Sequence, residues 1–246
     1  MRFLYIFPHP DDECFGPAPG MARQLREGHE VHLLTLTRGG ATKQRHRLGL
    51  TVGEMGEVRL AEMRRVEEVL GLTGMEVLDL PDSGLAEIDP RLIEDVVREA
   101  ILELVPDVVV TYAVHGISGF RDHLVTHAVV KRVYCELRDE APDRAPRRLA
   151  LFTLAEEEED AGDGPFTLRT SPPDLIDAGI AISRSDLAKG LEALACYETY
   201  REVIERADPL GRIGDTIWFE LFEESHAPPL SSLEERLPPR AAGGTG

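Results

Sequence analysis

The sequence predicts an α/β domain in which a mostly parallel, doubly wound sheet has the strand order 3-2-1-4-5 and carries a C-terminal helix-plus-strand appendage. Three observations lead to this prediction: strand-like apolar runs alternate with helical stretches, glycine or proline separates most of them, and the most β-branched run lies mid-chain. A length of 246 residues suits one domain of this class. We expect one domain over residues 1–226, with a core at 1–154 and an appendage at 155–226, followed by a disordered tail at 227–246.

The chain opens with a βαβ unit. Residues 1–7 form a short apolar run that ends at Pro8, which predicts a buried strand. Residues 19–27 place apolar side chains at helical spacing and end before Gly28, and residues 29–37 predict the second strand. Because parallel strands need a crossover between them, this unit indicates a parallel sheet with a right-handed connection.

The same alternation continues to residue 154. Helices are predicted at residues 54–70, 90–104 and 122–138, and strands at residues 75–80, 107–114 and 147–154. The most β-branched of these runs, DVVVTYAV, predicts a central strand that is buried on both faces. The repeat of strands and helices therefore predicts a Rossmann-like sheet.

The alternation weakens beyond Ala155. The acidic stretch EEEEDAGDG follows, which predicts a solvated linker. Ser185 is expected to cap a helix that runs to about Arg206, and residues 216–222 predict one more strand. The segment from Ala227 is rich in Pro, Ala and Gly, a composition that predicts too little buried surface for an ordered structure.

Composition and charge argue against several classes of function. The chain has 27 Lys and Arg against 45 Asp and Glu, and the net charge of −18 would repel a nucleic-acid backbone. No apolar run is long enough for a membrane span or a signal-peptide core, so we expect a cytoplasmic protein without a membrane partner. Three cysteines without a CxxC spacing predict neither a disulfide framework nor a cysteine zinc site. The oligomeric state stays open, and a homo-oligomer is compatible with the sequence.

Two groups of polar residues are expected to meet at one edge of the sheet. In doubly wound sheets the loops after the carboxyl ends of the strands share one edge, and the crevice lies where the strand order reverses. The loop with His9 and Asp12 after the first strand would then face the loop from His115 to His123 after the fourth. A catalytic zinc takes three nitrogen or oxygen ligands and keeps one position for water. His9, Asp12 and His123 are the candidate ligands for Zn²⁺, with Fe²⁺ as an alternative.

Two further aspartates have candidate roles. Asp11 stays outside the ligand set and is the candidate general base, because a carboxylate beside an activated water can remove its proton. The acidic run Asp11, Asp12 and Glu13 could instead cap the helix that follows. Asp122 is expected to orient the imidazole of a ligand histidine, to cap its helix, or to do both.

The string Pro8-His9-Pro10-Asp11-Asp12-Glu13 after an N-terminal strand resembles the signature of the PIG-L/LmbE family of zinc-dependent N-deacetylases. The resemblance extends to Leu36-Thr37-Arg38-Gly39-Gly40, to Arg59-x-x-Glu62 followed by Leu70-Gly71, to Asp122-His123, and more faintly to Ala193-Leu194-x-x-Tyr197. It implies zinc bound by the three candidate ligands, Asp11 as general base, and removal of an N-acetyl group from an N-acetylglucosaminide-like small molecule.

One position departs from the family pattern. The second motif of the family usually reads His-Pro-Asp-His, whereas Phe120-Arg121-Asp122-His123 stand here. The resemblance implies that the missing first histidine would stabilise the tetrahedral intermediate, and the loss of one such donor typically costs about 10²–10³ in turnover. Arg121 and His115 are the candidate substitutes in the same loop, and Arg38 could reach from the neighbouring loop.

The loop after the second strand carries positive charge in an otherwise strongly negative chain. Residues 38–53 contain Arg38, Lys43, Arg45 and Arg47 and no acidic residue. This contrast predicts that the loop binds a phosphate or carboxylate of the substrate beside its acetamide. A solvated, flexible loop is the alternative.

The sequence therefore predicts a metal-dependent N-deacetylase, and two alternatives stay open. The first is an amidase that acts on another acylated metabolite, such as a thiol conjugate. The second is a Rossmann-like binding protein that keeps its metal but has lost catalysis with the missing histidine. A dinucleotide site is not predicted, because the first βα turn lacks GxGxxG.

Overall fold

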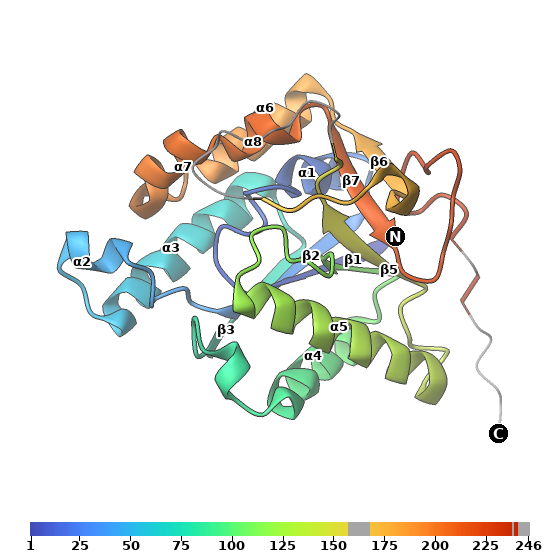
Figure 1. The fold of residues 1–246 in the computed structure, drawn as a ribbon, viewed down its shortest axis with the longest axis horizontal. Coiled ribbons are helices and arrows are strands. Elements are labelled where there is room, and N and C mark those ends of the chain that lie inside the picture. The colour runs from blue at the N-terminus through green and yellow to red at the C-terminus, as the bar shows by residue number, and fades with distance from the viewer. Residues whose placement is uncertain (157–167, 238, 241–246) are drawn as a thin grey trace.

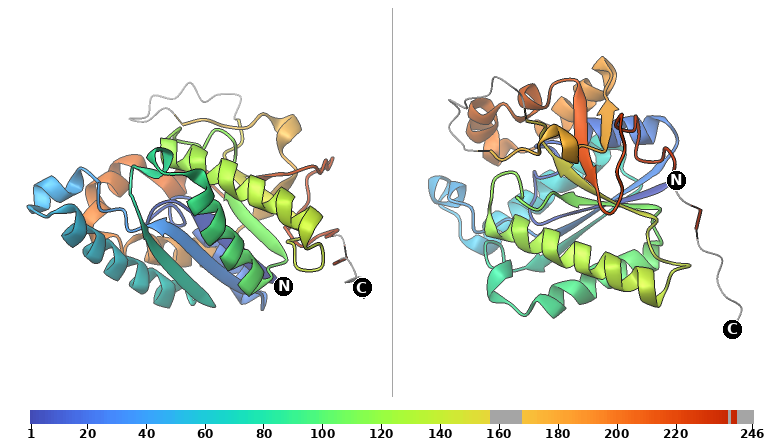
Figure 2. Two further views of the ribbon diagram at one scale, coloured as in Figure 1. Left: turned by 90° about the horizontal axis from the view of Figure 1, so that it is seen from below. Right: turned by 45° about the vertical axis from the view of Figure 1, so that its right-hand side comes forward.

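The protein is described by a computed structural model that covers residues 1–156, 168–237 and 239–240. A sheet with the strand order β3-β2-β1-β4-β5-β7-β6 lies between two layers of helices (Figure 1; Figure 2). The strands from β3 to β5 in this order are parallel, and β7 and β6 extend the sheet antiparallel beside β5. The predicted order 3-2-1-4-5 is therefore confirmed. Among the described helices, none is both long and apolar enough to cross a membrane.

The elements of the parallel part lie close to their predicted positions. The strands are β1 (Arg2–Phe7), β2 (Glu30–Thr37), β3 (Gly74–Leu80), β4 (Val108–Tyr112) and β5 (Arg148–Thr153). The helices are α1 (Ala18–Arg26), α2 (Gln44–Leu48), α3 (Val52–Leu70), α4 (Pro90–Leu104) and α5 (Arg121–Glu140), with the 3-10 turn η1 (Leu85–Glu87). The sequence analysis missed α2 and η1, which are short and lie in connections without apolar periodicity.

The strands are apolar on both faces because helices cover both faces of the sheet. Along β1, Phe3, Tyr5 and Phe7 share a core with residues of α1 and α3, whereas Leu4 and Ile6 share a core with residues of α4 and α5. All five residues of β4 are buried. The prediction of a central strand buried on both faces is confirmed.

The C-terminal region contains more elements than were predicted. They are η2 (Pro173–Leu175), β6 (Ala178–Ala181), α6 (Arg184–Leu194), η3 (Glu198–Tyr200), α7 (Arg201–Ala207), α8 (Pro209–Ile213) and β7 (Thr216–Leu221). The strand β7 was predicted and β6 was missed. The single helix expected from Ser185 is broken at η3, and its cap is Ser183, whose side chain accepts from the Asp186 backbone N. The predicted acidic linker begins at Glu156 and otherwise lies outside the described residues.

The prediction of a disordered tail is wrong for residues 227–237. Leu230 and Leu233 are 2% and 0% exposed and belong to the core on the α1 side of the sheet. Arg148 of β5 is fully buried and donates to the backbone carbonyl of Leu233. Composition alone did not predict that two buried leucines and the buried Arg148 hold residues 227–237 to the core. Residues 241–246 lie outside the described residues.

Asp186 connects α6 to α1 and provides a test of this packing. Its carboxylate accepts from the Ser183 backbone N at 3.0 Å and from Nε and Nη2 of Arg26, each at 3.0 Å. Burial raises the pKa of Asp186, but the hydrogen bonds from Arg26 and Ser183 outweigh burial and lower it to about 2.

We expect Asp186→Asn to lower the free energy of unfolding by about 1 kcal/mol at pH 7, as measured by urea denaturation. A lowered carboxyl pKa stabilises the fold above the unfolded pKa of 3.8, and this stabilisation is lost as the pH falls toward 2. The difference between the variant and the wild type should therefore shrink over that pH range. An equal difference at pH 7 and pH 2 would contradict this assignment.

Candidate active site

Three residues from the two predicted loops meet at the carboxyl edge of the sheet. β1 pairs in parallel with β4, with Tyr5 opposite Val110, so the loops after both strands leave from the same edge. Ligand atoms of His9, Asp12 and His123 lie within 4.8 Å of one another. The Asp12 carboxylate oxygens lie 3.5 Å from His9 Nδ1 and 3.3 Å from His123 Nε2. We call these three residues the candidate metal group.

The second nitrogen of each imidazole is occupied by another partner. His123 Nδ1 lies 2.9 Å from the Gly116 carbonyl oxygen, and His9 Nε2 lies 3.1 Å from Asp122 Oδ2. A neutral imidazole that donates from one nitrogen presents a lone pair at the other. His9 Nδ1 and His123 Nε2 are therefore available to a cation beside Asp12. The sequence analysis expected a contact of this kind for Asp122.

The charge around His9 suits a bound cation. The carboxylates of Asp12, Asp82 and Asp122 each have an oxygen within 3.5 Å of a nitrogen of this ring. Burial lowers the pKa of His9, but the hydrogen bonds to Asp12 and Asp122 outweigh burial and raise it to about 10. A metal ion would therefore bind by replacing the proton on Nδ1. Buried carboxylates require positive charge nearby. The donor set of two imidazoles and one carboxylate therefore fits a divalent metal such as zinc or iron.

Two residues that the sequence analysis did not identify complete the surroundings of this group. Tyr112, the last residue of β4, donates to Asp12 at 2.8 Å, and its ring stacks on His123 with 4.3 Å between centroids. Asp82 follows β3 and has an oxygen 3.4 Å from His9 Nε2. Tyr112 lies two residues before the end of the strand predicted at residues 107–114, and Asp82 had only its position after a predicted strand.

Asp11 is not part of the candidate metal group and reaches α3 instead. Its backbone has a φ of +83°, and its carboxylate accepts from Arg59 Nη2 at 2.5 Å. Burial raises the pKa of Asp11, Arg59 lowers it and Asp12 raises it, with a result of about 6. A buried carboxyl group with a raised pKa beside a metal group is typical of a general base.

Helix α3 connects Asp11 to the C-terminal region through two buried charged residues. The Arg59 side chain is 2% exposed, and its guanidinium carbon lies 4.1 Å from the centre of the Tyr200 ring. Glu62, three residues further along α3, accepts from the backbone N and the Oγ1 of Thr199, at 2.8 and 2.7 Å. The turn η3 therefore packs against the residue that holds Asp11, and the appendage forms part of the site.

The sequence contained a signal for this connection. Arg59 and Glu62 fall on the same stripe of α3 as the buried residues Met55, Met63 and Val66. A charged side chain within an apolar stripe must be paired when the helix packs. In the sequence, these two residues stood out only through the family resemblance.

The structure does not bring the two candidate substitutes for the missing histidine into the candidate metal group. The Arg121 side chain is 78% exposed and pairs with Glu87 at 3.0 Å, because it lies on the outer side of the first turn of α5. His115 Nε2 lies 3.2 Å from Ser171 Oγ and 3.2 Å from Thr153 Oγ1. His115 therefore joins the loop after β4 to the end of β5, and its catalytic role stays a prediction.

Two of the four basic residues of the loop after β2 pair with acidic residues of other elements. Arg38 pairs with Glu57 of α3, and Arg47 pairs with Glu202 of α7 at 3.0 Å. The loop itself contains no acidic residue, and its sequence gave no sign of the acidic residues of α3 and α7 that pair with it. That Arg38 and Arg47 bind an anionic group of the substrate stays a prediction.

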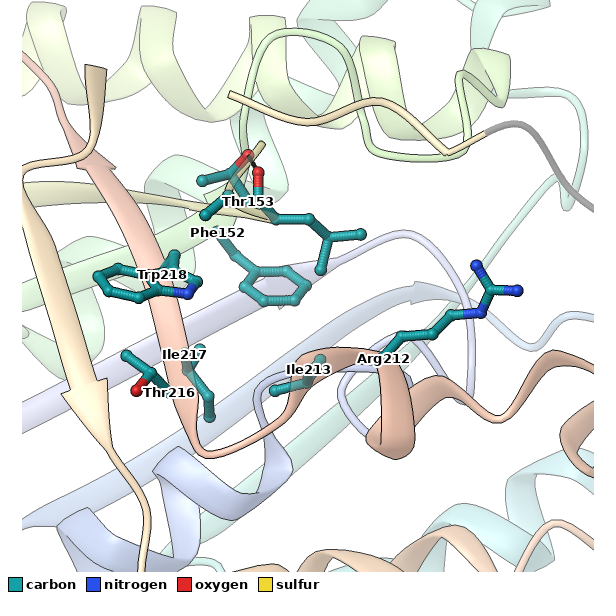
Figure 3. A pocket seen from close by; sticks show the side chains of 9 residues that line it. Phe152, Thr153, Arg212, Ile213, Thr216, Ile217 and Trp218 are labelled. Atoms are coloured by element: carbon teal, nitrogen blue, oxygen red, sulfur yellow. Dashed lines mark hydrogen bonds between the residues drawn. The ribbon is translucent and has the colours of Figure 1, made fainter. Parts of the chain in front are cut away.

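Two cavities of the described residues lie away from the candidate metal group. A cavity of about 30 Å³ lies between the ends of β5, β7 and α8, where Phe152, Ile213 and Trp218 contribute to its lining (Figure 3). This volume is enough for about one water molecule. A larger hollow of about 410 Å³ lies at the opposite, amino edge of the sheet and is lined in part by Arg2 and Gly74. We therefore expect a substrate to bind at the open carboxyl edge.

Comparison with known proteins agrees with this arrangement. The PIG-L family model, described as GlcNAc-PI de-N-acetylase, matches residues 4–134, which is over half of the chain. This chain belongs to the PIG-L family. The matched range contains His9, Asp12 and His123, and the resemblance found in the sequence is confirmed.

Two curated relatives of this PIG-L chain are a deacetylase and an amidase. The chain is 31% identical over 226 residues to the 1D-myo-inositol 2-acetamido-2-deoxy-alpha-D-glucopyranoside deacetylase of Geodermatophilus obscurus, covering 73% of this chain and 76% of the relative. It is 33% identical over 147 residues to the Mycothiol S-conjugate amidase of Streptomyces coelicolor, covering 52% of this chain and 50% of the relative. The family assignment therefore supports an amide hydrolase.

Solved structures share the fold at lower identity. N,N'-diacetylchitobiose deacetylase from Pyrococcus horikoshii matches with a TM-score of 0.67 and 17% identity, covering 90% of this chain and 83% of that chain. GalB, the 4-carboxy-2-hydroxymuconate hydratase from Pseudomonas putida, matches with a TM-score of 0.67 and 16% identity, covering 92% and 97%. Because one is a deacetylase and the other a hydratase, these likenesses establish the fold and not the reaction.

The buried pair of Arg59 and Asp11 provides a stability test. Arg59→Met would leave Asp11 buried without its partner, and we expect the free energy of unfolding at pH 7 to fall by about 3 kcal/mol. Arg65→Met is the control, because Arg65 lies on the same helix, is 47% exposed and pairs with Glu198 at the surface. Its expected loss is below about 1 kcal/mol. Equal losses in urea denaturation of the two variants would contradict the assignment.

Proposed function

We propose that this chain is a divalent-metal-dependent hydrolase that removes the N-acetyl group of an N-acetylglucosaminide-like small molecule. The observation that carries the proposal is the convergence of His9, Asp12 and His123, with Asp11 next to Asp12 in the chain and held by Arg59. Their nitrogen and oxygen donors suit Zn²⁺, with Fe²⁺ as an alternative. The similarity to a deacetylase of a 2-acetamido-2-deoxy-glucopyranoside supports this substrate class.

The candidate metal group and Asp11 divide the chemistry between them. His9, Asp12 and His123 would hold the cation, which when bound polarises the acyl oxygen and lowers the pKa of water. Asp11 accepts a proton from the attacking water while the water oxygen forms a bond to the acyl carbon. The same carboxyl group then delivers this proton to the amine nitrogen as the C–N bond breaks. The products are acetate and a free amine.

The neighbouring groups hold these side chains in position before a substrate binds. Arg59 fixes the Asp11 carboxylate, and Asp122 occupies His9 Nε2 so that Nδ1 remains available. The Gly116 carbonyl oxygen likewise occupies His123 Nδ1, so that His123 Nε2 remains available. Because the side chains are already ordered, little conformational entropy is lost when the reacting groups come together.

An anionic substituent on the substrate stays part of the proposal. Of the four residues predicted to contact it, Lys43 and Arg45 have no carboxylate partner among the described residues, and both lie at the start of α2. They are the side chains that we propose for this contact.

An amidase that acts on a thiol conjugate is the second candidate function. The 33% identity to a Mycothiol S-conjugate amidase favours it, and the same four residues would cleave its amide bond. Parallel assays of N-acetylglucosaminides and acylated thiol conjugates distinguish the two. Tight zinc uptake without turnover of any acyl donor would instead support a non-catalytic binding protein.

Asp11→Asn tests the general base. Asparagine keeps the size of the side chain and tolerates the left-handed backbone at a φ of +83°, but it cannot accept the proton. We expect amine release from an N-acetylglucosamine glycoside, with zinc restored, to fall by about 10²–10⁴-fold. The bound zinc per chain should stay the same, and wild-type activity in this variant would overturn the role of Asp11.

Metal removal and Asp122→Asn test the candidate metal group. Treatment with a chelator should abolish amine release, and added Zn²⁺ or Fe²⁺ should restore it.

We expect Asp122→Asn to weaken zinc affinity by about 10–100-fold in a titration against a competing chelator, because His9 Nε2 loses its charged partner. Asp139→Asn is the control on the same helix, with a side chain that is 74% exposed. Equal affinities of the two variants would contradict the proposed arrangement.

A further inference from the structure

The segment that contains the candidate ligand His123 carries three exposed apolar side chains. Val114, Phe120 and Leu124 are 64%, 62% and 39% exposed, and all three lie in the loop after β4 or the first turn of α5. We call these three residues the apolar rim. Single exposed apolar residues are common on protein surfaces, but three within one short segment next to a candidate catalytic group indicate a contact surface.

Phe120 breaks a local rule of helix formation without a gain in packing. It is the N-cap residue of α5 and makes no side-chain capping hydrogen bond. Ser, Thr, Asp and Asn are preferred at this position because their side chains accept from the free backbone N–H groups of the first turn. The ring is mostly exposed, so burial in the core does not compensate. Residues that are unfavourable for their local secondary structure, and are not compensated by packing, are expected at functional positions.

The apolar rim adjoins the reacting position directly. The Phe120 ring meets the His123 ring edge-on, with 5.6 Å between centroids and 82° between planes. His123 in turn directs Nε2 toward Asp12 at 3.3 Å. Leu124 lies one helical turn after Phe120, so both side chains lie on the same side of α5. A substrate whose amide lies at the candidate metal group would have its next substituent within reach of Phe120.

We propose that the apolar rim binds an alkyl or aryl substituent adjacent to the scissile amide, which makes Phe120 a specificity-determining residue. This inference rests on the proposed amide hydrolysis and specifies a substituent that the site would recognise. The substituent can be an acyl chain longer than acetyl or an apolar group on the amine side. The acyl chain and the amine-side group would be recognised in the same way, because either would cover the exposed carbon surface of Phe120 and Leu124 and release water from it.

Two series of substrates test the proposal and separate these two sources. The first series consists of glucosamine carrying acetyl, butanoyl, hexanoyl or octanoyl groups on nitrogen. The second consists of methyl, butyl, hexyl and octyl β-glycosides of N-acetylglucosamine. With the zinc-loaded protein, kcat/KM for amine release should rise in one series by up to about fourfold for each methylene group that reaches the rim. Equal values throughout both series overturn the proposal.

Phe120→Ser and a matched control assign the effect to the rim. We expect Phe120→Ser to flatten the rise with chain length, with a loss of about tenfold at the longest chain. Because serine restores an N-cap hydroxyl, the melting temperature should also rise by about 2–4 °C, which excludes unfolding as the cause. Leu191→Ser on α6 replaces a side chain that is 50% exposed and should keep the full dependence on chain length. A full dependence in Phe120→Ser overturns the proposal.

A binding measurement separates failure of this inference from failure of the proposed function. If no member of either series releases an amine, the hydrolase function fails. Calorimetry with hexyl and methyl β-glucoside then tests the apolar rim on its own. Tighter binding of the hexyl compound that is lost in Phe120→Ser supports the rim, and equal affinities for the two compounds overturn it.

Discussion

The parallel pairing of β1 with β4 is the constraint on which the site depends. Tyr5 lies opposite Val110 in this pairing, and both strands are covered by helices on both faces. A shift by one residue would exchange the side chains between two differently packed cores. Core packing therefore sets the positions at which the loops that lead to His9 and to His123 leave the sheet. The candidate metal group is assembled by the same apolar contacts that stabilise the domain.

The buried acidic loop after β1 requires compensation, and the C-terminal region supplies part of it. Burial raises the pKa of Glu13 to about 7, and Tyr197 of the appendage donates to this carboxyl group at 2.5 Å. Asp11 is compensated by Arg59, which lies against Tyr200. A buried carboxyl group without a partner is strongly destabilising. By supplying partners, the appendage helps to stabilise the site.

The surroundings that the sequence did not predict have a common cause. The tail was judged by composition, although Leu230 and Leu233 pack into the core. Arg38 was judged by the loop around it, although Glu57 from α3 neutralises it. His115 was judged by its closeness in sequence to His123, although its ring turns to the end of β5. In each case a neighbour that is distant in sequence decided the environment of the residue.

Features that depend on local physics could be predicted from the order of the amino acids. Strand and helix positions follow from apolar periodicity and turn residues, and the order of the five parallel strands follows from the right-handed crossovers and the buried run of β4. The motif around His9 and Asp12 was also visible in the sequence. The partners of these residues were not, because ion pairs, ring stacking and side-chain exposure depend on how separate elements pack. Asp82 beside His9, Tyr112 on His123 and the exposed ring of Phe120 emerged only once the chain was folded.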